Sequence, residues 1–292
     1  MAVLTQLVSR NLKLYLRDKA AVFFSFLSVI IIILLYVLFL GAMQTDSLAE
    51  NFGDIEGIDW LVSSWIMAGI LSVSTVTVPL MAIGRLIHDR DKKIIMDFYT
   101  SPIDRRTLAL SYLVSSWIIS FIMIIFNFIL GQGYVVMNGG EFLGFIATIQ
   151  ILSLVLLSII VFSSFFFFIA LYMKTVNAFS ILSTLVGTLV GFFGGIYIPI
   201  GVLGDNVQMV MNLLPTAHSV TLMRNIYMKE PIALVFDHAP QQAFDTYSYI
   251  YGLEVNVGEY TMSNFQLVLA MIAFGLIFYG LSIIKLRKTK LS

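Results

Sequence analysis

Two long stretches of the sequence, residues 60–84 and 107–140, contain no charged residue. The hydrocarbon core of a bilayer is about 30 Å thick and takes about 20 helical residues to cross. Charged residues make up only 12% of the chain, against about 25% in a soluble domain. The sequence therefore predicts an all-α polytopic membrane protein, in one domain over residues 1–292. Six apolar runs are long enough to be transmembrane helices, and they lie at 20–43, 60–84, 107–137, 142–173, 176–200 and 262–284.

Basic residues orient these spans. If both termini are cytoplasmic, fifteen of the seventeen Lys and Arg residues fall in cytoplasmic segments, and only Arg224 and Lys229 fall outside. Cytoplasmic loops of membrane proteins carry an excess of Lys and Arg. The first run is longer than a signal peptide and is not followed by a clear small-x-small cleavage site. We therefore predict a multi-pass protein of the plasma membrane with both termini in the cytoplasm.

The composition argues against several classes of function. The chain has no cysteine, so disulfides, thiol catalysis and thiolate metal sites are excluded. The three histidines are far apart and have no metal-ligand spacing. The formal net charge is zero, which argues against a nucleic-acid partner. A Gly-Lys dipeptide is absent, so the sequence carries no P-loop and no ATP site of that type.

The apolar runs contain no Asp, Glu, Lys, Arg or His. Ion-coupled carriers usually need such groups inside the bilayer, because these groups form the ion and proton pathways. Their absence argues against secondary transport and against a membrane enzyme such as an intramembrane protease. If the protein moves a solute uphill, the energy must come from a partner.

Residues 1–19 predict an amphipathic helix ahead of the first span. Gln6, Arg10, Lys13 and Arg17 recur at intervals of four, three and four residues, which places them on one helical face. Apolar residues lie mostly on the opposite face. A helix of this kind lies along the inner leaflet as an interfacial helix. A cytosolic cap with no membrane role is the alternative.

The segment 201–261 is the longest one on the predicted outer side. Its first half is apolar but is broken by Gly204 and Pro215, and each piece is too short to cross a bilayer. We expect two short re-entrant helices that dip into the outer leaflet while buried in protein. Residues 229–260 are polar and rich in tyrosine, and we expect a small extracellular lid there.

A basic segment, residues 85–106, separates the second and third runs. It reads RLIHDRDKKIIMDFYTSPIDRR and holds six of the seventeen Lys and Arg residues. Because it mixes these charges with apolar side chains, it is more than a connector. We expect it to be a structured cytoplasmic loop that binds a partner. A charged loop resting on anionic headgroups is the alternative.

The fifth run carries small residues at every fourth position. They are Ser183, Gly187, Gly191 and Gly195. Small residues at this spacing form a flat stripe that lets another helix approach closely. The stripe predicts either a subunit interface or helix packing inside one subunit, and the sequence alone does not separate the two.

Three polar residues inside the runs are candidates to line a cavity, namely Thr75, Asn127 and Gln150. Amide side chains are costly to expose to lipid, although hydrogen bonds between helices explain them equally well. The fourth run also contains four consecutive phenylalanines at 165–168. Because four consecutive residues cover every face of a helix, we expect them to face lipid, with a hydrophobic substrate wall as the alternative.

Several short motifs resemble one known family. The basic segment ends in YTSPIDRR, residues 99–106. This ending resembles the segment after the second span in permeases of the ABC type-2 exporter family, where a charged helix leads into a Ser-Pro-basic turn. Residues 194–199 (GGIYIP), 212–216 (NLLPT) and 222–224 (LMR) resemble the family's end of the fifth span, its Asn-Pro turn and its Arg-bearing outer helix. Together the motifs extend the likeness over nearly the whole chain.

The sequence departs from the family pattern in two places. The family often has Glu-x-x-x-Gly-Thr within the basic segment, whereas residues 89–94 read DRDKKI. Two leucines also separate Asn212 from Pro215 in the Asn-Pro turn. The first departure puts the details of a partner contact in question.

The resemblance implies the transmembrane half of an ATP-driven exporter. Two permease subunits, expected as a homodimer, would pair partly through the first and fifth spans. Two copies of a separate ABC ATPase subunit would bind ATP and magnesium, and no cofactor is expected on this chain. A cytoplasmic coupling helix at about 89–99 would sit in a cleft of the ATPase. Its coupling residues would be Asp89, Arg90, Asp91, Lys92, Lys93, Ile95, Met96 and Tyr99.

The implied function is export of a lipophilic or amphipathic substrate, such as a drug or antimicrobial compound, a peptide or a lipid-linked molecule. Membrane lipids are expected partners as well. The alternative is a membrane binding or immunity protein without a transport cycle. An ATPase partner separates the two hypotheses, because only the transporter needs one.

Overall fold

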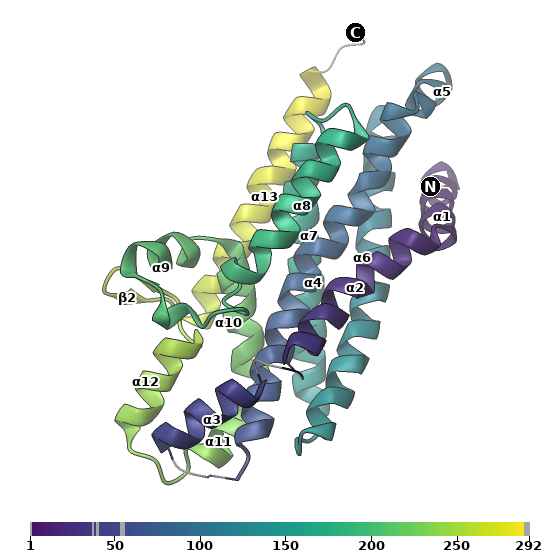
Figure 1. The fold of residues 1–292 in the computed structure, drawn as a ribbon. Helices are drawn as coiled ribbons and strands as arrows, with labels where there is room; N and C mark the ends of the chain where they lie inside the picture. The colour runs from purple at the N-terminus through teal and green to yellow at the C-terminus, as the bar shows by residue number, and fades with distance from the viewer. Residues whose placement is uncertain (1, 37, 39–40, 53–55, 289–292) are drawn as a thin grey trace.

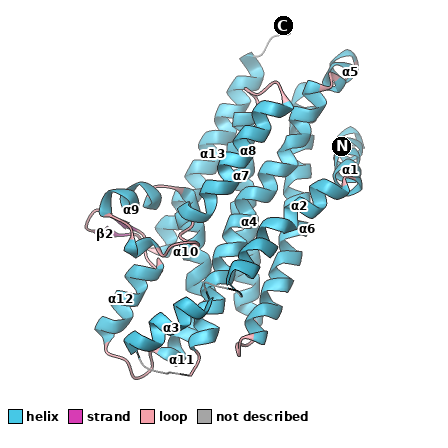
Figure 2. Ribbon diagram, viewed as in Figure 1, coloured by secondary structure: helices cyan, strands magenta, loops and turns pink. Residues whose placement is uncertain are grey.

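The computed structural model describes residues 2–36, 38, 41–52 and 56–288. Within these residues the regular structure is helical apart from one short hairpin (Figure 2). Parts of three predictions lie outside the described residues. These parts are residues 37, 39 and 40 of the predicted first span, residue 1 of the interfacial helix, and residues 289–292 of the domain.

Five described helices are long and apolar enough to cross a membrane, which confirms an all-α polytopic protein. The predicted first span contains α2 (Lys19–Leu35), which is a shorter apolar helix. The prediction of six spans therefore stays a prediction. The five long helices are α4 (Ile58–Asp91), α6 (Arg105–Met137), α7 (Phe145–Ala170), α8 (Val176–Phe193) and α13 (Asn264–Lys288).

Short elements join the long helices. The first ones are α1 (Ala2–Arg17), α3 (Gly41–Phe52) and α5 (Ile94–Thr100). Between α8 and α13 lie the 3-10 turn η2 (Ile200–Val202), α9 (Asp205–Asn212), α10 (Pro215–Tyr227), α11 (Lys229–Val235), α12 (Gln241–Tyr251) and the antiparallel strands β1 (Asn256–Val257) and β2 (Tyr260–Thr261).

Helix α4 is the centre of the bundle (Figure 1). At 1.5 Å per residue its 34 residues span about 51 Å, which is well beyond the bilayer core. It contacts α6, α7, α8 and α10, so 89% of its apolar window is buried, against 17% for α8 and 22% for α13. The helix therefore forms the buried core around which the other long helices pack.

Small hydroxyl side chains let other helices approach α4 closely. Ser72 on α4 donates to Ser219 on α10, with 3.1 Å between the oxygens. Ser219 also lies 3.0 Å from the hydroxyl of Ser158 on α7. All three residues are buried, so the contact joins three helices through hydrogen bonds that lipid cannot replace.

Aromatic packing joins α7 to α13 and corrects the expectation for residues 165–168. Phe166 and Phe167 are buried, and Phe165 stacks against Phe274 and Phe278 of α13 with ring centroids 5.5 and 4.9 Å apart. The expectation of lipid-facing side chains is therefore wrong for most of this block. At this end of α7 the side chains meet other helices, because α7 lies between α4, α6 and α13.

The segment between α8 and α13 is mostly helical. Gly204 is the N-cap of α9 and Pro215 is the first residue of α10, so the two predicted breaks do begin the two short helices. Helix α10 packs against α4, α7 and α13. That α9 and α10 dip into the outer leaflet stays a prediction. The predicted lid, residues 229–260, consists mainly of α11 and α12.

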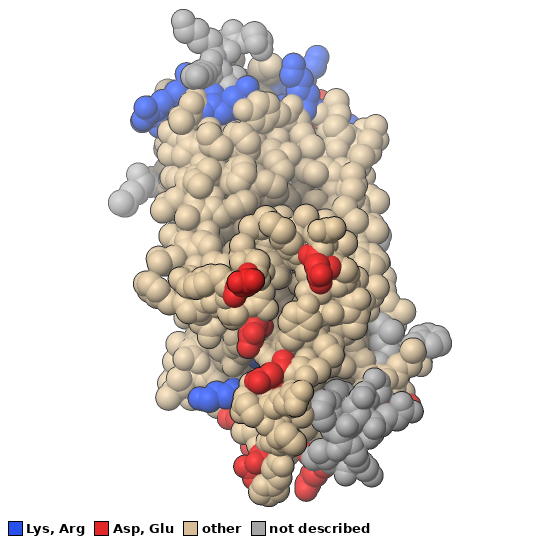
Figure 3. Space-filling view, turned by 90° about the vertical axis from the view of Figure 1, so that its left-hand side faces the viewer, with Lys and Arg blue, Asp and Glu red and all other residues tan. Residues whose placement is uncertain are grey.

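The two ends of the bundle differ in charge. Helices α1 and α5 and the end of α13 lie together at one end, and α3, α11 and α12 lie at the other (Figure 1). On the face shown in Figure 3, Lys and Arg gather at the first end, whereas Asp and Glu lie along the middle and at the second end. We call the first end the basic end.

Candidate functional site

The basic segment folds as a helix end, a tight turn and a second short helix. Helix α4 continues to Asp91, and the backbone N–H groups of Lys92 and Lys93 donate to carbonyls four and three residues back. Lys93 has φ 61°, the left-handed region that side chains rarely adopt. The expected coupling helix at 89–99 is therefore broken at 92–93, and its second part is α5.

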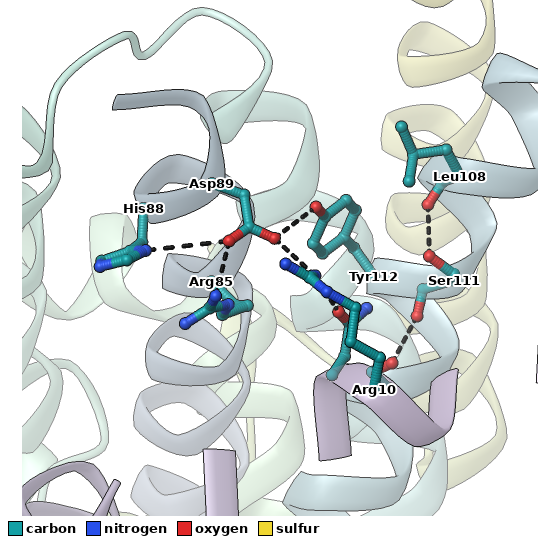
Figure 4. A network of polar contacts seen from close by, with 9 residues as sticks. Arg10, Arg85, His88, Asp89, Leu108, Ser111 and Tyr112 are labelled. Carbon is teal, nitrogen blue, oxygen red and sulfur yellow. Dashed lines mark hydrogen bonds and ion pairs between the residues drawn. The ribbon is translucent and has the colours of Figure 1, made fainter. Parts of the chain in front are cut away.

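The carboxylate of Asp89 holds the base of this turn. Its side chain has no exposed surface, and it pairs with Arg10 of α1 and Arg85 of α4, each nitrogen lying 2.7 Å from a carboxylate oxygen. The Tyr112 hydroxyl of α6 donates to it at 2.8 Å. Figure 4 shows the three groups converging on Asp89 from three helices, with His88 alongside.

The negative charge of Asp89 stabilises the ionised form of Arg10. Burial lowers the pKa of Arg10, but the hydrogen bond and negative charge of Asp89 outweigh it and raise the pKa above its ordinary value. The Arg10 guanidinium also lies over the Phe98 ring of α5, 5.1 Å from its centroid. Arg10 therefore joins α1 to both halves of the basic segment.

Three predicted coupling residues turn inward. Asp89 is buried as described, and Ile95 is 5% exposed in the hydrophobic core. Arg90 donates to the backbone carbonyls of Ala170 and Met173, which fixes the end of α7 to α4. Their side chains hold the segment in place from inside the subunit, and their contact with a partner stays a prediction.

The other five predicted coupling residues are exposed together at the basic end. Asp91, Lys92 and Lys93 form the turn. Met96 and Tyr99 follow on one face of α5, 52% and 38% exposed. The Arg105 guanidinium lies 4.9 Å from the centre of the Tyr99 ring. We call these five residues the coupling face; they combine charge with two large apolar side chains.

The small-residue stripe is divided by the end of α8. The helix stops at Phe193, and Gly195 sits in the following turn with φ 59°, so it does not continue the helical face. Gly191 and Gly195 are buried, and a side chain at Gly191 would meet the Tyr197 ring of the same subunit. These two positions serve packing within the subunit. Gly187 faces open space, and Ser183 is half-buried.

The three cavity candidates do not come together. Thr75 and Asn127 are buried between helices, where Thr75 donates to the Ser72 carbonyl at 2.7 Å and Asn127 donates to the Ser74 hydroxyl at 3.3 Å. Gln150 is exposed on the second turn of α7. Interhelical hydrogen bonding accounts for the amide nitrogen of Asn127, whereas its buried amide oxygen has no hydrogen-bond partner among the described residues. The structure gives the trio no shared site.

Sequence reasoning missed the partners of Asp89. Arg85 is four residues before Asp89 on one helix, a spacing that allows an ion pair, so this contact had a signal. Arg10 was expected to face lipid headgroups, and nothing in the sequence indicated that it reaches α4. Arg224 was singled out in the sequence, but its burial and its contacts were not predicted; it donates to the carbonyls of Gly194 and Gly195 and lies over the Trp65 ring.

Among the residues that the structure describes, no cluster of three His, Cys, Asp or Glu side chains could hold a metal ion. Residues 2–228 match the family model described as ABC-2 type transporter. A comparison with curated proteins found no match to the chain. The family match covers the basic segment, α8 and α10, and so includes every residue of the coupling face.

Proposed function

The chain belongs to the ABC-2 type transporter family, and we propose that it is the transmembrane subunit of an exporter driven by a separate ABC ATPase. Permeases of this family are membrane components that work with such a partner. ATP and magnesium would bind to the ATPase, because the 292 residues contain no P-loop. The observation that carries the proposal is the exposed coupling face. The end of α4 next to it is anchored by the ion pairs of the buried Asp89 with Arg10 and Arg85.

The coupling face has the composition of a docking surface. Interfaces place a few large apolar or aromatic side chains at the centre and charges at the rim. Met96 and Tyr99 would be the central contacts, and Asp91, Lys92 and Lys93 would fix the register. The left-handed Lys93 separates α5 from α4, and Met96 and Tyr99 of α5 are exposed at the basic end, which in the proposed orientation would face the cytoplasm.

Closure of the ATPase subunits would move α5 as a lever. Arg10, Asp89 and Tyr112 tie α1, α4 and α6 into one unit at its base, so a push on α5 is passed to the long helices rather than absorbed by a soft loop. Rigid-body shifts of helices at an interface are a common way to transmit such a step. Alternate opening of the bundle would then export the substrate.

The proposed orientation places the basic end in the cytoplasm, with both termini inside and the protein in the plasma membrane. The positive-inside rule supports this orientation. The proposed substrate is lipophilic or amphipathic, such as an antimicrobial compound, a peptide or a lipid-linked molecule. The resemblance to the exporter family is what suggests this substrate class.

The proposed homodimer would use the exposed face of α8. This face presents exposed side chains, namely those of Ile181, Thr184, Leu185, Thr188 and Leu189. The threonine hydroxyls donate to carbonyls of their own helix, so they add no unpaired donor to an apolar contact. Thr188→Trp should abolish cross-linking between subunits while the monomer stays folded, whereas unchanged cross-linking would contradict this interface.

The function is tested by removing the central contacts of the coupling face. Met96→Ala with Tyr99→Ala should weaken binding of the ATPase about 30-fold, because central interface residues contribute at least about 1 kcal/mol each. Met137→Ala with Tyr260→Ala is the matched control, since these side chains are 87% and 57% exposed and lie away from the basic end. Co-purification and ATP hydrolysis in vesicles are measured. Equal binding by both pairs, or no ATPase bound to the unmodified chain, would refute the proposal.

A further inference from the structure

A cavity of 760 Å³ opens at the basic end between α6 and α13, with α7 behind it. This volume is within the range of small-molecule sites, about 300–1,000 Å³. It is separate from the coupling face, since none of the five coupling residues lines it. Its floor is apolar and is formed by Ala109, Leu110, Leu113, Phe167, Ile283 and Leu286. We call it the α6–α13 groove.

Arginines line the outer end of this groove. Arg105 and Arg106 begin α6, and Arg287 lies in the last turn of α13, with Asp104 as the one acidic lining residue. Three positive charges against one negative charge leave an excess of two positive charges. Arg106 and Arg287 are exposed, so their guanidinium groups can reach an anion at the mouth of the groove.

The charge and the apolar floor lie at different depths. From Arg106 to Leu113 the helix rises seven residues, about 10 Å. A ligand that fits must therefore have an anionic head and an apolar body of comparable length. The apolar window of α13 is only 22% buried within the subunit, so this wall of the groove has little protein cover and a molecule within a leaflet can reach it from the side. Basic pockets between transmembrane helices on the cytoplasmic side suit anionic lipid headgroups.

We propose that the α6–α13 groove binds an anionic phospholipid of the cytoplasmic leaflet, with its phosphate at Arg106 and Arg287 and an acyl chain along Ala109, Leu110 and Leu113. The proposal rests on the proposed orientation of the chain and does not depend on the ATPase contact.

The groove also adjoins the coupling element. A smaller cavity of 60 Å³ shares Arg105, Ala109, Phe167 and Leu286 with the groove and is lined on its far side by Tyr99 and Ile95 of α5. Arg105 contacts Tyr99 directly. A lipid phosphate at the mouth would attract Arg105 and so change its contact with Tyr99, which would make coupling sensitive to the lipid composition of the inner leaflet.

Native mass spectrometry of the purified chain tests the proposal. The chain is exchanged into mixed micelles of phosphatidylglycerol and phosphatidylcholine, and the retained lipids are counted. We expect selective retention of phosphatidylglycerol and a fall of about fivefold for each arginine removed in Arg106→Ala and Arg287→Ala, since a basic residue near anionic lipid contributes about 1 kcal/mol. Lys229→Ala, which removes an exposed positive charge of α11 at the other end of the bundle, is the control for each single arginine variant and should retain lipid normally.

A second variant tests the acyl-chain site without changing charge. Leu110→Trp fills the half-buried floor and should lower retention while the arginines remain. Millimolar inorganic phosphate should not displace the lipid. The proposal is overturned if phosphatidylcholine is retained equally, if Lys229→Ala loses as much lipid as Arg106→Ala or Arg287→Ala, if Leu110→Trp retains lipid fully, or if free phosphate displaces it. Met96→Ala, which should weaken ATPase binding, should leave lipid retention unchanged. Failure of the lipid proposal can therefore be told apart from failure of the proposed function.

Discussion

Replacing Asp89 by Asn should release α1 from the bundle. The change removes the negative charge that pairs with Arg10 and Arg85 while keeping the size of the side chain. Removing one partner of a buried ion pair costs about 3–5 kcal/mol. The two arginine side chains are 28% and 22% exposed and so keep part of their hydration. We therefore expect a cost below this range, about 2–3 kcal/mol.

This cost should appear as local undocking. A loss of about 2–3 kcal/mol raises the undocked fraction of α1 about 30- to 150-fold. Trypsin can then cleave after Lys13 and Arg17, which are exposed but helical in the docked state. Because opening is fast relative to cleavage at low protease, the cleavage rate follows the open population. The assay is limited trypsin digestion of the chain in lipid nanodiscs, followed by mass spectrometry.

Asp91→Asn is the matched control, because Asp91 lies two residues further on and is exposed. It should leave the cleavage rate of α1 unchanged. Equal rates for Asp89→Asn and the unmodified chain would refute the claim that this carboxylate anchors α1. A rise of the same size in both variants would show that only surface charge matters.

Two further substitutions test packing inside the subunit. Gly191→Leu should lower the free energy of unfolding by about 1–3 kcal/mol through overpacking, because the new side chain would overlap the Tyr197 ring. Gly187→Ala is the control and should be tolerated, because Gly187 faces open space. If a denaturant titration finds both variants equally stable, Gly191 does not serve packing within the subunit. Gln132→Leu should cost about 1–3 kcal/mol, since Gln132 donates to Tyr227 and accepts from the Leu143 backbone N–H; a variant as stable as the parent would show that water or lipid replaces these bonds.

The sequence predicted the long helices well because each is a continuous apolar run bounded by charge. It also located the basic segment, because charge between uncharged runs is visible without a fold. It failed where side-chain partners come from distant helices. Arg10 and Asp89 are 79 positions apart, and no periodicity within either helix indicates that they meet.

The glycine stripe illustrates a different limit. Its four-residue spacing assumes one continuous helix, but α8 ends at Phe193 and Gly195 adopts a left-handed turn. The Gly194-Gly195 pair and Pro199 are signals of that stop, but a spacing pattern alone does not take them into account. The sequence does not reveal that Arg224 of α10 donates to the carbonyls of Gly194 and Gly195. Similarly, the local pattern does not indicate that the phenylalanines at 165–168 of α7 contact α13.

Contact between α5 and an ATPase is the central claim, and disulfide or thiol cross-linking tests it most directly. The chain has no native cysteine, so single cysteines at Met96 or Tyr99 report only their own surroundings. Both should cross-link to the co-purifying ATPase, and binding of ATP should change the yield. Met137→Cys, at the opposite end of α6 and 87% exposed, should not cross-link and should react with an impermeant thiol reagent from outside the cell. Absence of cross-linking at both α5 positions, or cross-linking at Met137→Cys, would contradict the account.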